Sequence, residues 1–173
     1  VLDIGCGWGG MASHIYKKSN ANVVGVTLSE EQIAYAQQRK VREKLDKVEY
    51  RLQDYRNVNE KYDRIVSVGM FEHVGTAHYQ EFFNKVYDLL NDSGVALIHT
   101  IGRLNEPGNT DPWIDKYIFP GGYIPALSET VSRVEKSGLS LTDVQVLKFH
   151  YAETLKRWRY NFYDNMDKVK EIY

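Results

Sequence analysis

The chain has 173 residues, of which 43% are hydrophobic and 26% charged, and its formal net charge is −1. This length suits one α/β domain with a buried core, and the composition excludes a disordered chain. The nearly neutral balance provides no overall field that would attract nucleic acid, so we expect no nucleic-acid partner.

Cysteine usage and hydropathy indicate the cellular setting. No apolar run approaches the roughly 18–20 residues of a membrane span, and no secretory signal is visible. The single cysteine, Cys6, cannot form an internal disulfide, which fits a reducing compartment. We therefore predict a cytoplasmic protein without a transmembrane segment. Because the chain starts in an apolar strand and ends in a helical pattern at Ile172-Tyr173, we expect a piece of a longer protein, truncated at both ends.

Strand and helix patterns alternate along the sequence. In chain order the predicted elements are strand 1–4, helix 9–18, strand 22–27, helix 29–45, strands 48–52 and 64–68, helix 78–90, strand 95–100, helix 128–137, strand 141–149 and a final helix from Tyr151. Ser29 and Gln32 have the spacing of a capping box at the start of the second helix. Repeated strand–helix units predict a Rossmann-like α/β fold with a doubly wound, mostly parallel sheet and ligands at its carboxyl edge.

Two stretches have a different character. Residues 102–125 are rich in proline, glycine and aromatic residues, which indicates a folded, functional loop. The last helix carries an apolar stripe at helical spacing: Tyr151, Leu155, Trp158, Phe162, Met166 and Val169. The run "LKRWRYNFY" within it fits either a membrane-surface helix or a core stripe with a solvated basic face. We favour the core stripe, because it already accounts for the aromatic residues.

The opening stretch "VLDIGCGWGG" fits two kinds of nucleotide-binding loop. Gly5, Gly7 and Gly10 have the spacing of a dinucleotide fingerprint. Asp3, followed by glycines at alternate positions, instead has the pattern of a loop that holds S-adenosylmethionine. Both interpretations place Gly5 and Gly7 where the backbone turns sharply and approaches a ligand.

The ends of the next two strands decide between these interpretations. A nicotinamide site requires an acidic residue after the second strand, but that strand ends at Thr27, and Glu30 already belongs to the helix. Asp3 can instead meet a cationic amino-acid group. After the third strand, Asp54 can accept a hydrogen bond from an adenine amino group, and Tyr55 can stack on the ring. These features together favour S-adenosylmethionine and hence methyl transfer.

The stretch "SVGMFEHVG" after the fourth strand indicates which atoms are methylated. DNA and protein-amide methyltransferases usually carry an Asn- or Asp-Pro-Pro-aromatic motif at this place, and no proline is present here. Glu72 lies here instead, His99 ends the following strand, and Tyr151 begins the final helix. We expect these three polar groups to converge on one site. The five histidines show no paired ligand spacing, so we predict no metal site.

A family resemblance spans nearly the whole chain. It rests on "VLDIGCGWGG", "VVGVTLSEEQ", "LQDYR", "DRIVSVGMFEHVG", "LIHTIG", "DPWIDKYIFPGG" and "HYAETLKRW". These stretches together closely resemble the cyclopropane-fatty-acyl-phospholipid synthases and their relatives, the mycolic acid cyclopropane synthases. The resemblance implies a single class I methyltransferase domain over residues 1–173. It also implies that an upstream cofactor-covering segment with a cysteine, which is not Cys6, and a final strand lie outside this chain.

The resemblance further implies a substrate, a mechanism and site residues. The substrate is an unsaturated phospholipid at the inner face of the membrane, and the protein is peripheral there, with a homodimer as its expected assembly. A bound bicarbonate acts as base, held by Glu72, His99 and Tyr151 with help from the backbone of Ile101. The implied residues that bind S-adenosylmethionine are Asp3, Gly5, Gly7, Thr27, Leu28, Gln32, Asp54, Tyr55 and Gly69.

Other functions remain open on the same scaffold. A lipid C-methyltransferase would leave a methyl branch, and a small-molecule N-methyltransferase would need no bicarbonate base. A non-catalytic module would bind S-adenosylmethionine without turnover. An NAD-dependent oxidoreductase is the remaining alternative, and it requires binding of NAD.

Overall fold

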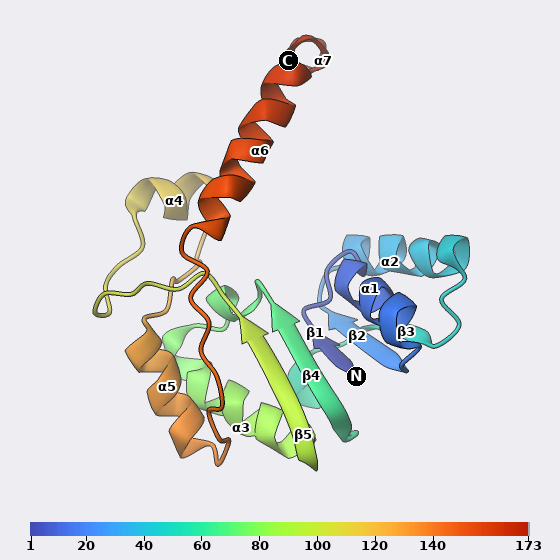
Figure 1. Ribbon diagram of the computed structural model, residues 1–173, viewed down its shortest axis with the longest axis vertical. Helices are drawn as coiled ribbons and strands as arrows, with labels where there is room; N and C mark the ends of the chain where they lie inside the picture. The colour runs from blue at the N-terminus through green and yellow to red at the C-terminus, as the bar shows by residue number, and fades with distance from the viewer. Residues whose placement is uncertain (173) are drawn as a thin grey trace. The chain divides into compact units, whose positions relative to one another are not determined.

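The computed structural model describes residues 1–172 and contains a five-stranded sheet (Figure 1). Its strands are β1 (Leu2–Ile4), β2 (Val23–Thr27), β3 (Val48–Leu52), β4 (Tyr62–Val68) and β5 (Leu90–His99). They lie in the order β3-β2-β1-β4-β5, and each neighbouring pair is parallel. The structure therefore confirms the predicted α/β class with a parallel sheet.

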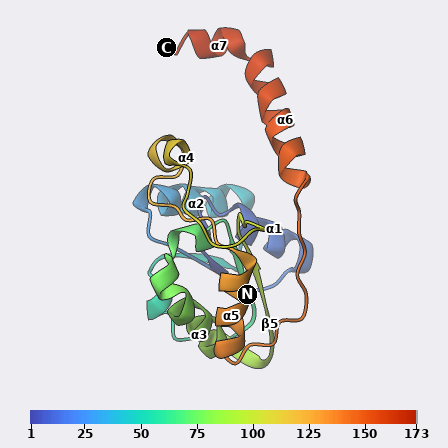
Figure 2. The ribbon, with the colours of Figure 1, turned by 90° about the vertical axis from the view of Figure 1, so that its left-hand side faces the viewer.

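Helices follow most of the strands. The α-helices are α1 (Gly10–Ser19), α2 (Glu30–Glu43), α3 (Tyr79–Leu89), α4 (Pro112–Tyr117), α5 (Leu127–Lys136), α6 (His150–Asp164) and α7 (Met166–Lys170). The short 3₁₀ helices are η1 (Tyr55–Asn57), η2 (Phe71–His73) and η3 (Thr76–His78). Helix α1 contacts β2, α2 contacts β3, and α3 lies beside α5, as Figures 1 and 2 show.

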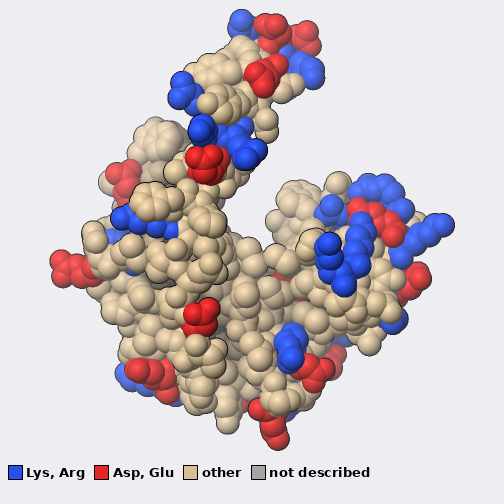
Figure 3. Space-filling view, in the orientation of Figure 1, with Lys and Arg blue, Asp and Glu red and all other residues tan. Residues whose placement is uncertain are grey.

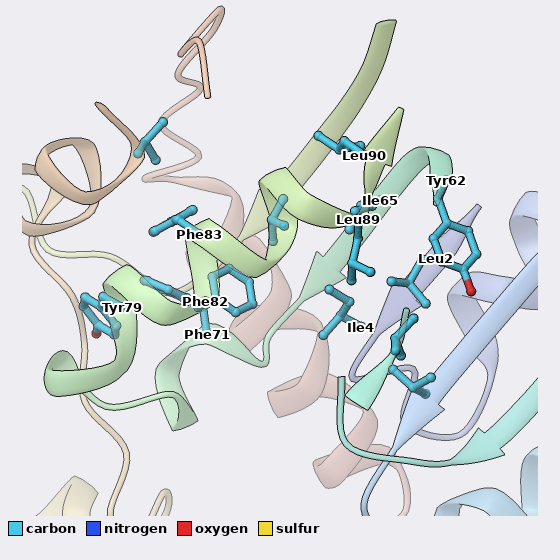
Figure 4. Packing of buried hydrophobic residues seen from close by; sticks show 14 residues of the cluster. Leu2, Ile4, Tyr62, Ile65, Phe71, Tyr79, Phe82, Phe83, Leu89 and Leu90 are labelled. Carbon is cyan, nitrogen blue, oxygen red and sulfur yellow. The ribbon is translucent and has the colours of Figure 1, made fainter. Parts of the chain in front are cut away.

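Two separate apolar clusters lie on opposite faces of the sheet, and the second one lies beside β2 and β3, whereas Val95 and Leu97 of β5 are 53% and 58% exposed. Because neighbouring strand residues point to opposite faces, Val24 and Val26 pack on one side of β2 and Val23 on the other. The first cluster centres on aromatic side chains of η2 and α3, and Figure 4 shows Phe71 among Tyr79, Phe82 and Phe83. The second cluster joins Val23 to buried residues of α1 and α2. Burial on both faces is typical of parallel sheets and holds their carboxyl edge in place.

Basic side chains gather over α1 and α2 on the face shown in Figure 3. Glu43 neutralises part of this group, because its carboxylate lies 2.8 Å from Lys17 and 2.9 Å from Arg39. Hydrogen bonds from Lys17, Arg39 and Ser13 hold the pKa of Glu43 at about 2. Part of this basic surface is therefore an ion-pair network centred on Glu43.

The regular part of β5 begins where the sequence predicts it. Strand β5 starts at Leu90, opposite Tyr62, but the next aligned pair is Arg64 with Val95. The predicted turn at residues 91–94 thus forms an irregularity inside the strand. Within the predicted loop 102–125, Asp111 caps helix α4, whose backbone amides at Trp113 and Ile114 donate to its carboxylate. The sequence pattern had not indicated this helix.

The predicted strand over residues 141–149 is wrong. These residues adopt no strand, and Leu141, Val144 and Val146 are 45–53% exposed. Alternating apolar residues favour a strand, but an extended segment is stable only when a neighbouring strand satisfies its backbone groups.

The chain divides into two compact units, Val1–Ser140 and Leu141–Tyr173. In the second unit, the prediction that the α6 stripe packs in a core is also wrong. Leu155, Trp158 and Phe162 are 47–59% exposed, because this unit offers α6 only the short helix α7 as a helical neighbour. Ile172 lies in a turn beyond α7, and the predicted helical end at Tyr173 lies outside the described residues. The assignment of residues 1–173 to one domain stays a prediction.

Candidate functional site

The candidate site residues of the first unit follow the carboxyl ends of its strands. The glycine loop follows β1, Thr27 ends β2, Asp54 follows β3, Gly69 follows β4, and His99 ends β5. Because all five strands are parallel, these positions share one edge of the sheet. This edge is where open α/β sheets bind their ligands.

The glycine loop is fixed to the neighbouring strand β2. The backbone amides of Gly5 and Cys6 both donate to the carbonyl of Val26, at 3.0 Å each. Gly5 and Gly7 have φ angles of +76° and +53°, which side-chain-bearing residues rarely adopt. A Cβ at Gly5 would lie 2.6 Å from Cγ of Met70, whereas a Cβ at Gly7 would meet no atom within 4 Å. Gly5 is thus required by packing, while Gly7 faces open space that a ligand can enter.

This difference predicts separate effects of alanine at the two glycines. We expect Gly7→Ala to lower affinity for S-adenosylmethionine while reducing the free energy of unfolding by only about 1–2 kcal/mol, the cost of left-handed backbone. Gly5→Ala should destabilise the fold more, because a steric clash adds to the same backbone strain. Urea unfolding and calorimetric titration of both variants test this, and equal loss of stability in the two would contradict it.

Cys6, in the middle of the loop, is a packing residue. Its side chain is buried, and burial, together with the charge of Asp3, raises the pKa of its thiol to about 12. Cys6 therefore stays a neutral thiol near neutral pH and is unsuited to act as a nucleophile.

Asp3 is a buried carboxylate without a full set of partners. Its side chain is 1% exposed, and Oδ2 has no hydrogen-bond partner among residues 1–172. Burial raises the pKa of Asp3 to about 7, although hydrogen bonding with the backbone of Ala12 opposes this shift. A cationic group beside Oδ2 would favour the ionised carboxylate. Asp3 and the open space at Gly7 thus fit the amino-acid end of S-adenosylmethionine.

The end of β2 presents a hydroxyl and an amide instead of an acid. The hydroxyl of Thr27 donates to Oε1 of Gln32 at 2.8 Å, and the backbone amide of Gln32 donates to the capping hydroxyl of Ser29. This places the predicted pair of ribose ligands in direct contact. Leu28, between the strand and the cap, is 71% exposed.

Asp54 and Tyr55 follow β3, and each has a partner within the protein. Arg56 binds the Asp54 carboxylate through its backbone amide at 2.9 Å and through Nη2 at 2.6 Å. These contacts hold the pKa of Asp54 below its usual value. The ring of Tyr55 packs edge-on against Phe82, with centroids 5.5 Å apart. Arg56 belongs to the motif "LQDYR", but the sequence pattern does not show its contact with Asp54.

Glu72 in η2 is the most constrained residue of the predicted catalytic set. It is 9% exposed, and its Oε1 accepts a hydrogen bond of 2.7 Å from the amide of Ile101. Its backbone carbonyl accepts another from the amide of Tyr123, at 3.0 Å. Oε2 is buried and has no hydrogen-bond partner in the part of the chain that the structure describes. Glu72 therefore presents one fixed oxygen and one oxygen that can bind a further donor.

The other members of this set have different surroundings. His99 has an exposed side chain, and its carbonyl accepts from the amide of Gly69 at 3.0 Å, which joins the ends of β4 and β5. Ile101 follows two residues later and directs its amide at Glu72. Tyr151 lies at the start of α6 in the second unit, where it packs edge-on against Trp158. The convergence of Tyr151 with Glu72 and His99 stays a prediction.

Within residues 1–172, no three His, Cys, Asp or Glu side chains are grouped as a bound metal ion would need. None of the helices in this range combines the length and apolar character needed to cross a bilayer.

Comparison with known proteins relates this site to a family. A family model described as mycolic acid cyclopropane synthetase matches residues 1–173. The cyclopropane-fatty-acyl-phospholipid synthase of Escherichia coli strain K12 is 43% identical over 173 residues, which cover 100% of this chain and 44% of that protein. The chain thus spans less than half the length of that relative.

Solved structures show the same likeness in three dimensions. The cyclopropane synthase MmaA2 from Mycobacterium tuberculosis has a TM-score of 0.86 at 34% identity, covering 99% of this chain and 65% of that chain. The mycolic acid cyclopropane synthase CmaA1, complexed with SAH and CTAB, has a TM-score of 0.85 at 36% identity, covering 96% and 64%. These likenesses confirm the resemblance and the predicted class I methyltransferase fold.

Proposed function

Because this chain belongs to the mycolic acid cyclopropane synthetase family, we propose that it forms the catalytic part of an S-adenosylmethionine-dependent enzyme that modifies lipids. The reaction we propose adds a methylene group across a cis double bond of an unsaturated phospholipid acyl chain, forming a cyclopropane ring. The observation that carries this proposal is the buried carboxylate of Glu72, whose Oε2 is unpaired among residues 1–172. Transfer of a methyl group to an amine would need no base that removes a proton from the transferred methyl carbon.

S-adenosylmethionine, when bound, supplies an electrophilic methyl group on a sulfonium. In our proposal Asp3 holds its ammonium group, and the backbone at Gly5 and Gly7 passes close to it. Thr27 and Gln32 bind the ribose hydroxyls. The remaining contacts come from Leu28, Asp54, Tyr55 and Gly69. For Asp54 to accept from adenine, its carboxylate must share the contact with Arg56.

The chemistry requires a base that receives a proton after the new carbon–carbon bond forms. The double bond would attack the methyl carbon as the carbon–sulfur bond breaks, with its electron pair returning to sulfur, so that the neutral thioether leaves and the acyl chain carries positive charge. Loss of a proton from the transferred methyl would then close the ring. We propose that a bicarbonate ion accepts this proton. The side chains of Glu72, His99 and Tyr151 hold the bicarbonate ion. His99 and Tyr151 can donate hydrogen bonds to an anion, and Oε2 of Glu72 can accept the bicarbonate hydroxyl. The amide of Ile101 contributes by fixing Oε1 of Glu72.

The site of action follows from the substrate. A phospholipid acyl chain lies within a bilayer, so the enzyme must reach it from the membrane surface. We propose a cytoplasmic protein, peripheral to the inner face of the membrane. A homodimer stays a prediction.

Product analysis tests the proposed function. The full-length protein is incubated with S-adenosylmethionine and vesicles of a cis-monounsaturated phospholipid, and matched vesicles with saturated chains serve as control. We expect acyl chains that gain one methylene group and lose their double bond, only in the unsaturated vesicles. Unmodified lipid together with bound S-adenosylmethionine would contradict the proposal and point to small amines or to a module without catalysis.

A further inference from the structure

Both hydrogen bonds from outside η2 that hold Glu72 come from the two ends of one long loop. The amide of Ile101, on the outgoing end, binds Oε1 at 2.7 Å, and the amide of Tyr123, on the returning end, binds the backbone carbonyl at 3.0 Å. The separation of these ends therefore determines how the Glu72 carboxylate is placed. A residue that holds the two ends together therefore affects the position of the Glu72 carboxylate without contacting Glu72.

Arg103 fastens the two ends. Its backbone amide donates to the carbonyl of Pro125 at 3.0 Å, and its Nε donates to the carbonyl of Ile124 at 3.1 Å. Its Nη2 donates to the carbonyl of Asn109 at 3.1 Å, further along the outgoing end. Its guanidinium also lies 5.9 Å from the ring centre of Tyr123. The side chain thus contacts Ile124, Asn109 and Tyr123, in addition to the bond that the backbone amide makes to Pro125.

The guanidinium of Arg103 is suited to binding several backbone carbonyls at once. Arg103 is partly buried and forms no ion pair with any carboxylate in residues 1–172, so its donors serve backbone carbonyls. The planar guanidinium presents several donors in fixed directions, which a flexible lysine amine does not. The returning end has a second anchor, since the Tyr123 hydroxyl donates to both carboxylate oxygens of Glu129 in α5, at 3.1 and 3.0 Å.

We infer that Arg103 is a positioning residue for Glu72: it closes the base of the loop, and the closed loop holds the carboxylate through Ile101 and Tyr123. This inference rests on the proposed function where it concerns turnover. Its structural part, the coupling of Arg103 to the hydrogen bonds of Glu72, does not depend on which lipid is modified.

The test compares Arg103→Met with Arg64→Met in the full-length protein. Arg64 is an exposed arginine at the start of β4, and its one side-chain hydrogen bond goes to the carbonyl of its neighbour Asp63. We expect Arg103→Met to speed hydrogen exchange at the amide of Ile101 about tenfold or more, while amides of β1 keep their protection. Arg64→Met should change neither. Unchanged exchange at Ile101 in Arg103→Met would overturn the inference.

Kinetics in two backgrounds provide the second readout. We expect Arg103→Met to lower kcat about 10- to 100-fold, the effect of a displaced catalytic group, with little change in KM for S-adenosylmethionine. In the Glu72→Gln background the same substitution should have almost no further effect, because the group that it positions is already lost. Equal losses in both backgrounds would overturn the inference. If Glu72→Gln alone keeps full turnover, the proposed function fails, and the exchange result still decides whether Arg103 positions Glu72.

Discussion

Glu72→Gln is expected to lower turnover roughly 10²–10⁴-fold, the range observed when an acid–base group is removed, and to leave affinity for S-adenosylmethionine nearly unchanged. Glutamine keeps an oxygen that can accept from the amide of Ile101, so the local backbone should stay in place. It replaces the free carboxylate oxygen with an amide that has no negative charge and cannot take up a proton near neutral pH. The predicted cofactor contacts other than Gly69 lie at the ends of β1, β2 and β3, away from the strand that Glu72 follows.

The matched control for this substitution is Glu81→Gln. Glu81 is an exposed glutamate in α3 that contacts His78 and has no part in the site. Turnover measured on vesicles and the dissociation constant from calorimetry should both match the unmodified protein for this control. An equal loss of turnover and of cofactor affinity in Glu72→Gln would mean that Glu72 is a binding or folding residue.

Asp3→Asn should have opposite effects on the empty protein and on its ligand complex. The folded pKa of Asp3, about 7, lies above its reference value of 3.8. Between these values the folded protein retains a proton that the unfolded chain has released, so this group makes the free energy of unfolding fall as pH rises from 3.8 to about 7. Above about pH 7 the free energy of unfolding falls no further through this group. Asparagine cannot ionise, so the variant should be more stable than the unmodified protein at pH 8 and should lose most of this advantage towards pH 4.

The affinity for S-adenosylmethionine should fall in Asp3→Asn, whereas the stability of the ligand-free protein rises. An ionised Asp3 favours a cationic ligand, so we expect Asp3→Asn to weaken S-adenosylmethionine binding by at least about tenfold, the equivalent of one lost charge-assisted hydrogen bond. In the unmodified protein, affinity should rise with pH through about 7, where Asp3 ionises. Urea unfolding at pH 5 and pH 8 and calorimetric titration measure both effects, with the exposed Asp46→Asn as control. A cofactor affinity that is unaffected by Asp3→Asn would contradict the assignment.

The place of several candidate site residues in the fold could be predicted because strand ends are visible in the sequence. Asp3 lies within the first apolar strand, Gly5 follows that strand and Glu72 comes after the fourth strand, and a parallel sheet brings such strand ends to one edge. The sequence could not show which groups these residues contact. The bond from Ile101 to Glu72 joins residues 29 positions apart, and the pairing of Asp54 with Arg56 depends on the turn that η1 makes.

The incorrect predictions share a physical cause. Residues 141–149 alternate in hydropathy like a strand, and α6 carries an apolar stripe like a packed helix. Such periodicity describes the surface of the segment itself and does not show whether a partner surface lies against it. The loop over residues 102–125 shows the reverse case. No periodic pattern in the sequence predicts its structure, yet the backbone amide and side chain of Arg103 hold the loop closed with hydrogen bonds to three carbonyls.

The central claim is that a methyl group is transferred to a lipid double bond and then loses one proton. The most direct measurement uses S-adenosylmethionine with a trideuterated methyl group, the full-length protein and vesicles of cis-unsaturated phospholipid, followed by mass spectrometry of the acyl chains. We predict saturated, ring-bearing chains that retain two of the three deuterium atoms. Chains that retain all three would contain an intact methyl branch, and both ring formation and the role of Glu72 beside a bicarbonate base would be contradicted.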